Sequence, residues 1–182
     1  MRAYVRSHVP CRTIHRILCL GGPRIAVGAL TTAGLIAALN FVTVLATPSS
    51  GQTTTAIGRG TIPQGFKAHA NTDQLDVKIE SKGSVDVIVN NNKLIPGGTV
   101  GWHSHTGPVI VLIRKGSMSV YDAFCSPQVF YAGEAFVENV TNDHVHTVRN
   151  EGMEDLEWTA TTFAPVGAAG KIDQPAPATC PL

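Results

Sequence analysis

The chain has 182 residues, of which 14 are basic and 13 acidic, so its formal net charge at pH 7 is only +1. The charges are unevenly placed, because five arginines precede residue 25 whereas the first acidic residue is Asp73. Without those arginines, nine basic residues stand against 13 acidic ones, a balance of about −4. Phosphate binding needs a basic face, so this balance excludes nucleic acid as a partner. The length leaves room for a short N-terminal appendage and one domain of ordinary size.

The N-terminal segment predicts export. Residues 1–24 are basic, and residues 25–46 contain no charged side chain. An apolar helix of ~20 residues can cross a bilayer, and the positive-inside rule then keeps residues 1–24 cytoplasmic. Small residues near Ala46 suit a cleaved signal peptide, while the length of the apolar run suits a retained membrane anchor. Both interpretations place the remaining chain outside, either secreted or anchored facing outward.

The cysteines agree with an oxidising compartment. Cys11 and Cys19 belong to the N-terminal segment, which leaves an even pair, Cys125 and Cys180, in the exported part. We predict a disulfide between them that ties the C-terminus to the folded body. Two free buried thiols are the alternative.

Beyond the apolar segment, residues 47–65 are rich in Ser, Thr, Gly and Pro and predict a flexible linker. The domain expected over residues 66–165 contains short alternating runs separated by turn residues, and no segment has a helical period. Such a pattern predicts an all-β antiparallel sandwich or barrel. Residues 166–182 are expected to be a coil tail. The predicted strands are 75–80, 85–89, 109–113, 117–121, 128–131, 135–138, 146–149 and 156–163.

Four of the seven histidines form two His-x-His pairs, His103 with His105 and His144 with His146. On a β-strand, residues at i and i+2 point to the same face. We therefore predict that the pairs converge on one metal ion. The alternative, hydrogen-bonded histidines that only fill a barrel interior, requires a polar partner for each buried imidazole.

The glycine and histidine spacing resembles the first motif of the cupin superfamily: Gly97, five residues, His103-x-His105, then Gly116. Gly133 followed by His146-x-x-x-Asn150 is similar to the second motif, with two extra residues before the histidine and no Pro-x-Gly. Gly-Trp-His-Ser-His, Val-Arg-Asn-Glu-Gly and the C-terminal Cys-Pro resemble small exported bacterial cupins with a type-2 domain. The resemblance implies a single jelly-roll-like antiparallel β-barrel, which here would follow an N-terminal hydrophobic helix and precede the coil tail.

The resemblance also implies a metal site. Carried over by position, the ligands are His103, His105 and His146, while the position of the family's glutamate is occupied by Val109. Either the site has three histidines, or another group supplies a fourth ligand. His144 is the first candidate, since it shares a face with His146 if the strand extends that far. The acids Glu138 and Asp143 are expected to lie in a solvated loop.

Three neutral imidazoles leave a divalent ion with its full charge, so the predicted centre should prefer an anionic ligand. Imidazole suits several metals. We favour Fe²⁺, with Zn²⁺, Mn²⁺, Ni²⁺ and Cu²⁺ as alternatives.

Three functions agree with these features. The first is a dioxygenase-like oxidoreductase acting on a small organic anion in the barrel mouth, for which no catalytic acid or base is assigned. The second is a non-catalytic module at the cell surface that binds a small ligand or the metal itself. The third is a barrel that has lost its metal. A homodimer formed through the outer sheets is a further expectation from the resemblance.

Overall fold

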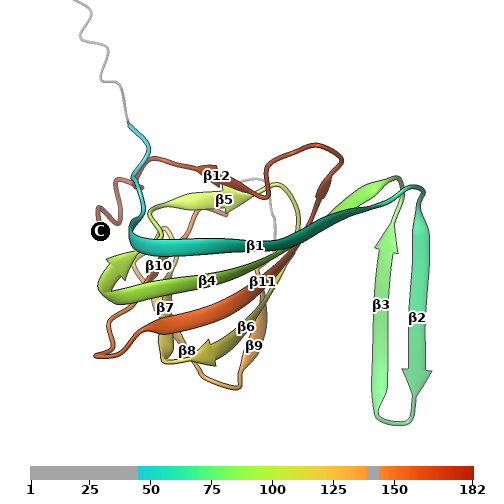
Figure 1. Cartoon of the computed structure of the whole chain (residues 1–182), viewed down its shortest axis with the longest axis horizontal. Helices are drawn as coiled ribbons and strands as arrows, with labels where there is room; N and C mark the ends of the chain where they lie inside the picture. The colour runs from blue at the N-terminus through green and yellow to red at the C-terminus, as the bar shows by residue number, and fades with distance from the viewer. Residues whose placement is uncertain (1–44, 139–143) are drawn as a thin grey trace, which may run out of the picture. The chain divides into compact units, whose positions relative to one another are not determined.

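The computed structural model describes residues 45–138 and 144–182, and all regular structure in these ranges is β (Figure 1). The strands are β1 (Ser50–Ile62), β2 (Phe66–Thr72), β3 (Leu75–Ser81), β4 (Val85–Thr99), β5 (His103–His105), β6 (Val109–Lys115), β7 (Ser117–Tyr121), β8 (Pro127–Tyr131), β9 (Ala135–Glu138), β10 (Thr147–Arg149), β11 (Leu156–Pro165) and β12 (Lys171–Asp173).

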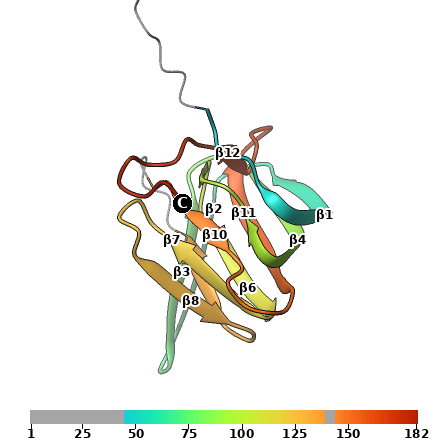
Figure 2. The ribbon, with the colours of Figure 1, turned by 90° about the vertical axis from the view of Figure 1, so that its left-hand side faces the viewer.

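The main sheet is antiparallel and forms a nearly closed barrel. Its strand order is β8-β7-β10-β4-β11-β6-β9, and β1 pairs with β4 outside this order. Figure 2 shows the sheet curling, with β7 and β8 on one side and β1 and β4 on the other. The all-β antiparallel fold predicted from the alternating runs is therefore present in the described part of the chain.

Alternation along the strands determines which side chains face the interior. In β6, Val109, Val111 and Ile113 are buried, whereas Ile110 and Leu112 are exposed. This two-residue period is the one expected for a strand with one buried face. The buried apolar residues pack into one cluster: Leu94, Val100, Val109, Val111, Ile113, Met118, Val148, Leu156 and Trp158.

The segment expected to be a flexible linker is ordered instead. Most of residues 47–65 form β1, which pairs with β4 from Ser50 opposite Thr99 to Ile62 opposite Val85. The expectation was wrong because Ser, Thr and Gly dominate linkers, while threonine is also a good strand former. A long neighbouring strand with unpaired backbone groups provides the partner that the composition does not reveal.

The run at residues 75–80 forms a strand, but this strand lies outside the main sheet. β2 and β3 pair only with each other, from Phe66 opposite Ser81 to Thr72 opposite Leu75. The alternating apolar residues of β3 are 41–49% exposed: Leu75, Val77 and Ile79. Alternation correctly indicated a strand but did not specify its partner.

The C-terminal tail is partly a strand rather than all coil. β12 pairs with β5, placing Lys171 opposite His105. The predicted disulfide between Cys125 and Cys180 is present, with their Cα atoms 5.2 Å apart. The indole Nε1 of fully buried Trp102 donates a hydrogen bond to the carbonyl oxygen of Leu182, 3.3 Å away. The tail therefore covers the backbone next to the first histidine pair.

Several expectations fall outside the described residues. These are the basic segment 1–24, the N-terminal helix and almost all of the apolar segment 25–46, and Asp143. Within the residues that the structure does describe, we find no helix of the length and apolarity that a membrane span requires.

Asp86 joins β1, β4 and the turn after β11. Its side chain is 3% exposed, and its oxygens accept hydrogen bonds from Arg59, Thr61 and the backbone N–H of Gly167. The Thr61 hydroxyl, followed by Gly167 and Arg59, lowers the pKa of Asp86 to about 2. The ionised carboxylate is therefore a structural tie between β1 and the barrel.

We predict that this tie makes stability depend on pH. A carboxylate whose pKa is lowered by folding stabilises the protein above its unfolded-state pKa of about 4, and that stabilisation is lost as the pH falls towards 2. In urea titrations, the unfolding free energy should fall more steeply between pH 4 and pH 2 for the wild type than for Asp86→Asn. Asp76→Asn, at an exposed position of the hairpin, is the control. Parallel profiles for wild type and Asp86→Asn would contradict the prediction.

The disulfide should also contribute to stability. Its cysteines are 55 residues apart, and closing a loop of that length is worth about 4 kcal/mol in the chain-entropy model. We expect the Cys125→Ser/Cys180→Ser variant to lose up to about that amount of unfolding free energy in urea titrations. Peptide mass mapping without reduction should find the two cysteines linked. Free thiols at both positions in the untreated protein would be the opposing result.

Candidate metal centre

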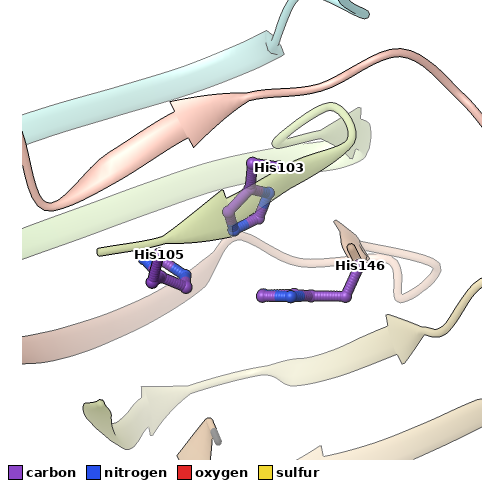
Figure 3. A group of neighbouring side chains, drawn as sticks. All are labelled: His103, His105 and His146. Atoms are coloured by element: carbon purple, nitrogen blue, oxygen red, sulfur yellow. The ribbon is translucent and has the colours of Figure 1, made fainter. Parts of the chain in front are cut away.

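The first histidine pair is positioned by a tight turn and a short strand. Gly101 has a φ of +75°, and a Cβ there would lie 2.3 Å from the carbonyl oxygen of Thr47. Only glycine satisfies both the left-handed conformation and this close approach. The strand β5 follows at once, and His103 and His105 point to the same side of it (Figure 3).

His146 is fixed beside this pair by backbone hydrogen bonds. The N–H of His103 donates to the carbonyl oxygen of His146 at 2.9 Å, and the N–H of His146 donates to that of His103 at 3.0 Å. The three imidazoles consequently face one another, and ligand nitrogens from His103, His105 and His146 lie within 4.8 Å of one another. The structure therefore brings together the three residues that the motifs selected.

Hydrogen bonds with the backbone also determine which ring nitrogen of His103 and of His105 is available to bind a metal ion. The Nδ1 atoms of His103 and His105 lie 2.9 Å from the carbonyl oxygens of Gly101 and Gly170. A carbonyl oxygen only accepts, so each Nδ1 donates a proton to it, and Nε2 is the ring nitrogen that remains for another partner. This orientation of a histidine by a carbonyl is the usual arrangement around a bound metal.

Buried nitrogen atoms without partners indicate the site of a ligand. The Nε2 of His105 and both ring nitrogens of His146 are buried and have no hydrogen bond within the described residues. Burial, followed by the charges of His146 and His105, holds the pKa of His103 well below its usual range, so this imidazole is neutral. Convergent imidazole nitrogens without partners of their own fit a divalent metal ion.

A carboxylate absent from the predicted ligand set lies against these histidines. Glu138 was expected in a solvated loop, but its side chain is only 8% exposed at the end of β9. Its Oε2 is 2.9 Å from His105 Nε2, and its Oε1 is 3.4 Å from His146 Nε2. The expectation was wrong because alternation along β9 places Phe136 and Glu138 on the inner face, a signal that the sequence contained.

Glu138 is ionised in this setting. Burial opposes ionisation, but His105 and His146 outweigh it, and the pKa of Glu138 falls well below its usual range. The centre therefore consists of three imidazoles next to one carboxylate, rather than imidazoles alone.

The other candidate ligands lie differently. His144 is exposed and is not part of the three-histidine group, although its ring centroid is 5.7 Å from that of His146. Val109 faces the interior and is only 1% exposed. Its side chain is part of the apolar wall near the histidines.

His103 and His105 open into a cavity of about 360 Å³. One part of its wall is apolar and includes Val109, Met118 and Trp158; another carries the amides of Asn90 and Asn92. β1 contributes Gln52 and Thr54 to the polar part, and the Thr54 hydroxyl donates to Asn92 Oδ1 at 2.8 Å. Sequence reasoning missed this wall because it treated β1 as a linker. A cavity of this size and lining suits a small polar molecule.

Comparisons with known proteins match this chain only at the level of solved structures. No family model matches it, and no curated protein does. An uncharacterized Klebsiella pneumoniae protein with a double-stranded β-helix domain aligns at TM-score 0.42 and 21% identity, over 49% of this chain and 70% of that one. A cupin-like protein from Thermotoga maritima aligns at TM-score 0.43 and 18% identity, over 50% and 65%.

An oxalate oxidase in complex with the substrate analogue glycolate aligns at TM-score 0.41 and 24% identity. The alignment covers 48% of this chain and 45% of the oxalate oxidase, so this chain spans less than half of that protein. Two of these similar structures are described as a cupin-like protein and as a protein with a double-stranded β-helix domain. What this chain binds is inferred from its own residues.

Proposed function

We propose that this chain is a cupin that binds one divalent metal ion through His103, His105 and His146. The observation that carries the proposal is the convergence, at the edge of a cavity, of buried imidazole nitrogens that have no hydrogen-bond partner among the described residues. A purely structural group of histidines would leave these polar atoms unsatisfied at a cost of about 1–3 kcal/mol each. A bound ion satisfies them together.

The most specific function that agrees with this site is a dioxygenase-like oxidation of a small organic anion. Bound Fe²⁺, the metal we favour, would supply a Lewis-acidic centre with redox capacity. The Gly101 and Gly170 carbonyls hold the imidazoles in orientation. The apolar wall around Val109 and Met118 excludes water, while the Asn90 and Asn92 amides offer hydrogen bonds that orient a polar substrate.

A non-catalytic binding module is the second candidate, and the cavity lining favours it in one respect. Within residues 45–138 and 144–182, the only ionisable side chain that lines the cavity besides His103, His105 and Glu138 is Lys171, which pairs with Asp173. A wall with so few proton donors and acceptors suits retention of a small ligand, or of the metal itself, as well as it suits turnover.

Export is part of the proposal. The basic segment 1–24, the apolar segment 25–46 and the disulfide support a location beyond the membrane, either secreted or anchored facing outward. In that location the cavity would meet small molecules of the extracytoplasmic space. A homodimer formed through the outer sheets remains part of the same proposal.

Metal content is the first test. The natively purified full chain should contain about one metal ion per chain by elemental analysis, and His103→Ala/His146→Ala should contain almost none, because it removes two of the three imidazoles. His69→Ala, at an exposed hairpin histidine, is the matched control and should retain the metal. We expect the same of His144→Ala, since that side chain is exposed. Equal metal in the wild type and the double variant would reject the site.

Oxygen consumption then separates the two candidate functions. With Fe²⁺ bound, the wild type should consume oxygen with at least one member of a panel of small carboxylic acids and phenols, and His103→Ala/His146→Ala should not. One tightly held zinc ion and no turnover would instead support the binding module. The measurement uses an oxygen electrode, with His69→Ala as the control for nonspecific iron chemistry.

A further inference from the structure

We infer that Glu138 is the fourth protein ligand of the metal ion, supplied from β9 in place of the carboxylate that position 109 lacks. The inference rests on the proposed metal site at His103, His105 and His146. It assigns a ligand outside both histidine motifs, and it changes the charge of the centre.

Strand register places Glu138 where this ligand is needed. β6 and β9 are antiparallel neighbours, and Val109 lies directly opposite Glu138. Both residues are buried on the inner face of the barrel, and as whole residues Val109 is 1% exposed and Glu138 9%. Residues opposite each other on one face have Cβ atoms about 4.5–5.5 Å apart. A carboxylate at position 138 on β9 therefore reaches the same part of the interior that a carboxylate at position 109 on β6 would occupy.

The separations of the carboxylate oxygens fit atoms that share an ion. Glu138 Oε2 lies 2.9 Å from His105 Nε2, and Glu138 Oε1 lies 3.4 Å from His146 Nε2. Two ligand atoms each ~2.1 Å from one ion are ~3.0 Å apart at a right angle and ~3.4 Å apart at the tetrahedral angle. Despite this proximity, neither Nε2 makes a hydrogen bond in the described residues. Each Nε2 and the Glu138 oxygen next to it are thus as close together as two ligand atoms of a common centre.

Charge leads to the same conclusion. Within residues 45–138 and 144–182, the ion pairs of Glu138 are with His105 and His146 only, and no lysine or arginine contacts it. A buried carboxylate without a full countercharge is costly. A divalent ion provides that countercharge. The carboxylate in turn reduces the net charge of the centre from +2 to +1, which weakens the preference for anionic ligands that three imidazoles alone would produce.

Because residues 109 and 138 are opposite each other, the inference can be tested by moving the carboxylate from one position to the other. The probe is Co²⁺ alone, and the protein is the full chain. Glu138→Gln, which keeps the shape of the side chain, should weaken Co²⁺ binding on the order of 100-fold and change the visible absorption of the bound ion, because a ligand is lost. Glu138→Val should lose at least as much. Val109→Glu/Glu138→Val, which moves the carboxylate to the opposite position on β6, should recover most of the affinity.

Circular dichroism and thermal unfolding of every variant exclude loss of fold as the cause. If Glu138→Gln keeps the wild-type affinity, or weakens binding while leaving the Co²⁺ spectrum unchanged, Glu138 is not a ligand and the inference is overturned. The three-histidine site would survive that result provided that His103→Ala/His146→Ala fails to bind Co²⁺. Absence of Co²⁺ binding by the wild type would instead overturn the proposed function together with the inference.

Discussion

The two backbone hydrogen bonds between His103 and His146 are the constraint on which the candidate site depends. They join β5 to the residue just before β10. These segments are more than forty residues apart in the chain, and the bridge brings their imidazoles to one point. Around this bridge, the carbonyls of Gly101 and Gly170 direct the nitrogens of the first pair. The barrel thus places these histidines mainly through the main chain, and placement by the main chain is what the proposed metal site needs.

The buried carboxylate of Glu138 is the second feature of the candidate site. An ionised Glu138 beside partly desolvated imidazoles is a costly arrangement in an empty barrel, and a divalent ion would relieve it. The same carboxylate would lower the net charge of a bound divalent ion, which three neutral imidazoles alone would leave unchanged. Position 109 lacks a carboxylate, yet the interior at this depth contains one, because antiparallel register makes residues 109 and 138 neighbours. The place of a residue on the inner face of the barrel is therefore a better guide to its neighbours than its distance along the chain from a motif.

The cavity wall contains polar residues whose position could not be predicted from the sequence around them. β1 brings Gln52 and Thr54 to the wall, and β4 brings Asn90 and Asn92. Polar residues of these types are common in linkers and turns, so only the pairing of β1 with β4 reveals their position. This polar wall, set against the apolar wall around Val109, makes the cavity suitable for a small molecule with distinct polar and apolar sides.

The sequence by itself determined the class of fold, because two-residue alternation has few solutions other than antiparallel sheet. Through its resemblance to the cupin motifs it also indicated the three histidines that the structure brings together, and the even pair of cysteines outside the N-terminal segment predicted the disulfide. Tertiary structure alone decided which strand pairs with which. Three features follow from that pairing: β1 lies antiparallel to β4, β2 and β3 form a separate hairpin, and Glu138 faces the barrel interior. The physical reason is that a strand's pattern specifies which of its faces is buried, whereas its partner depends on hydrogen-bonding groups contributed by another part of the chain.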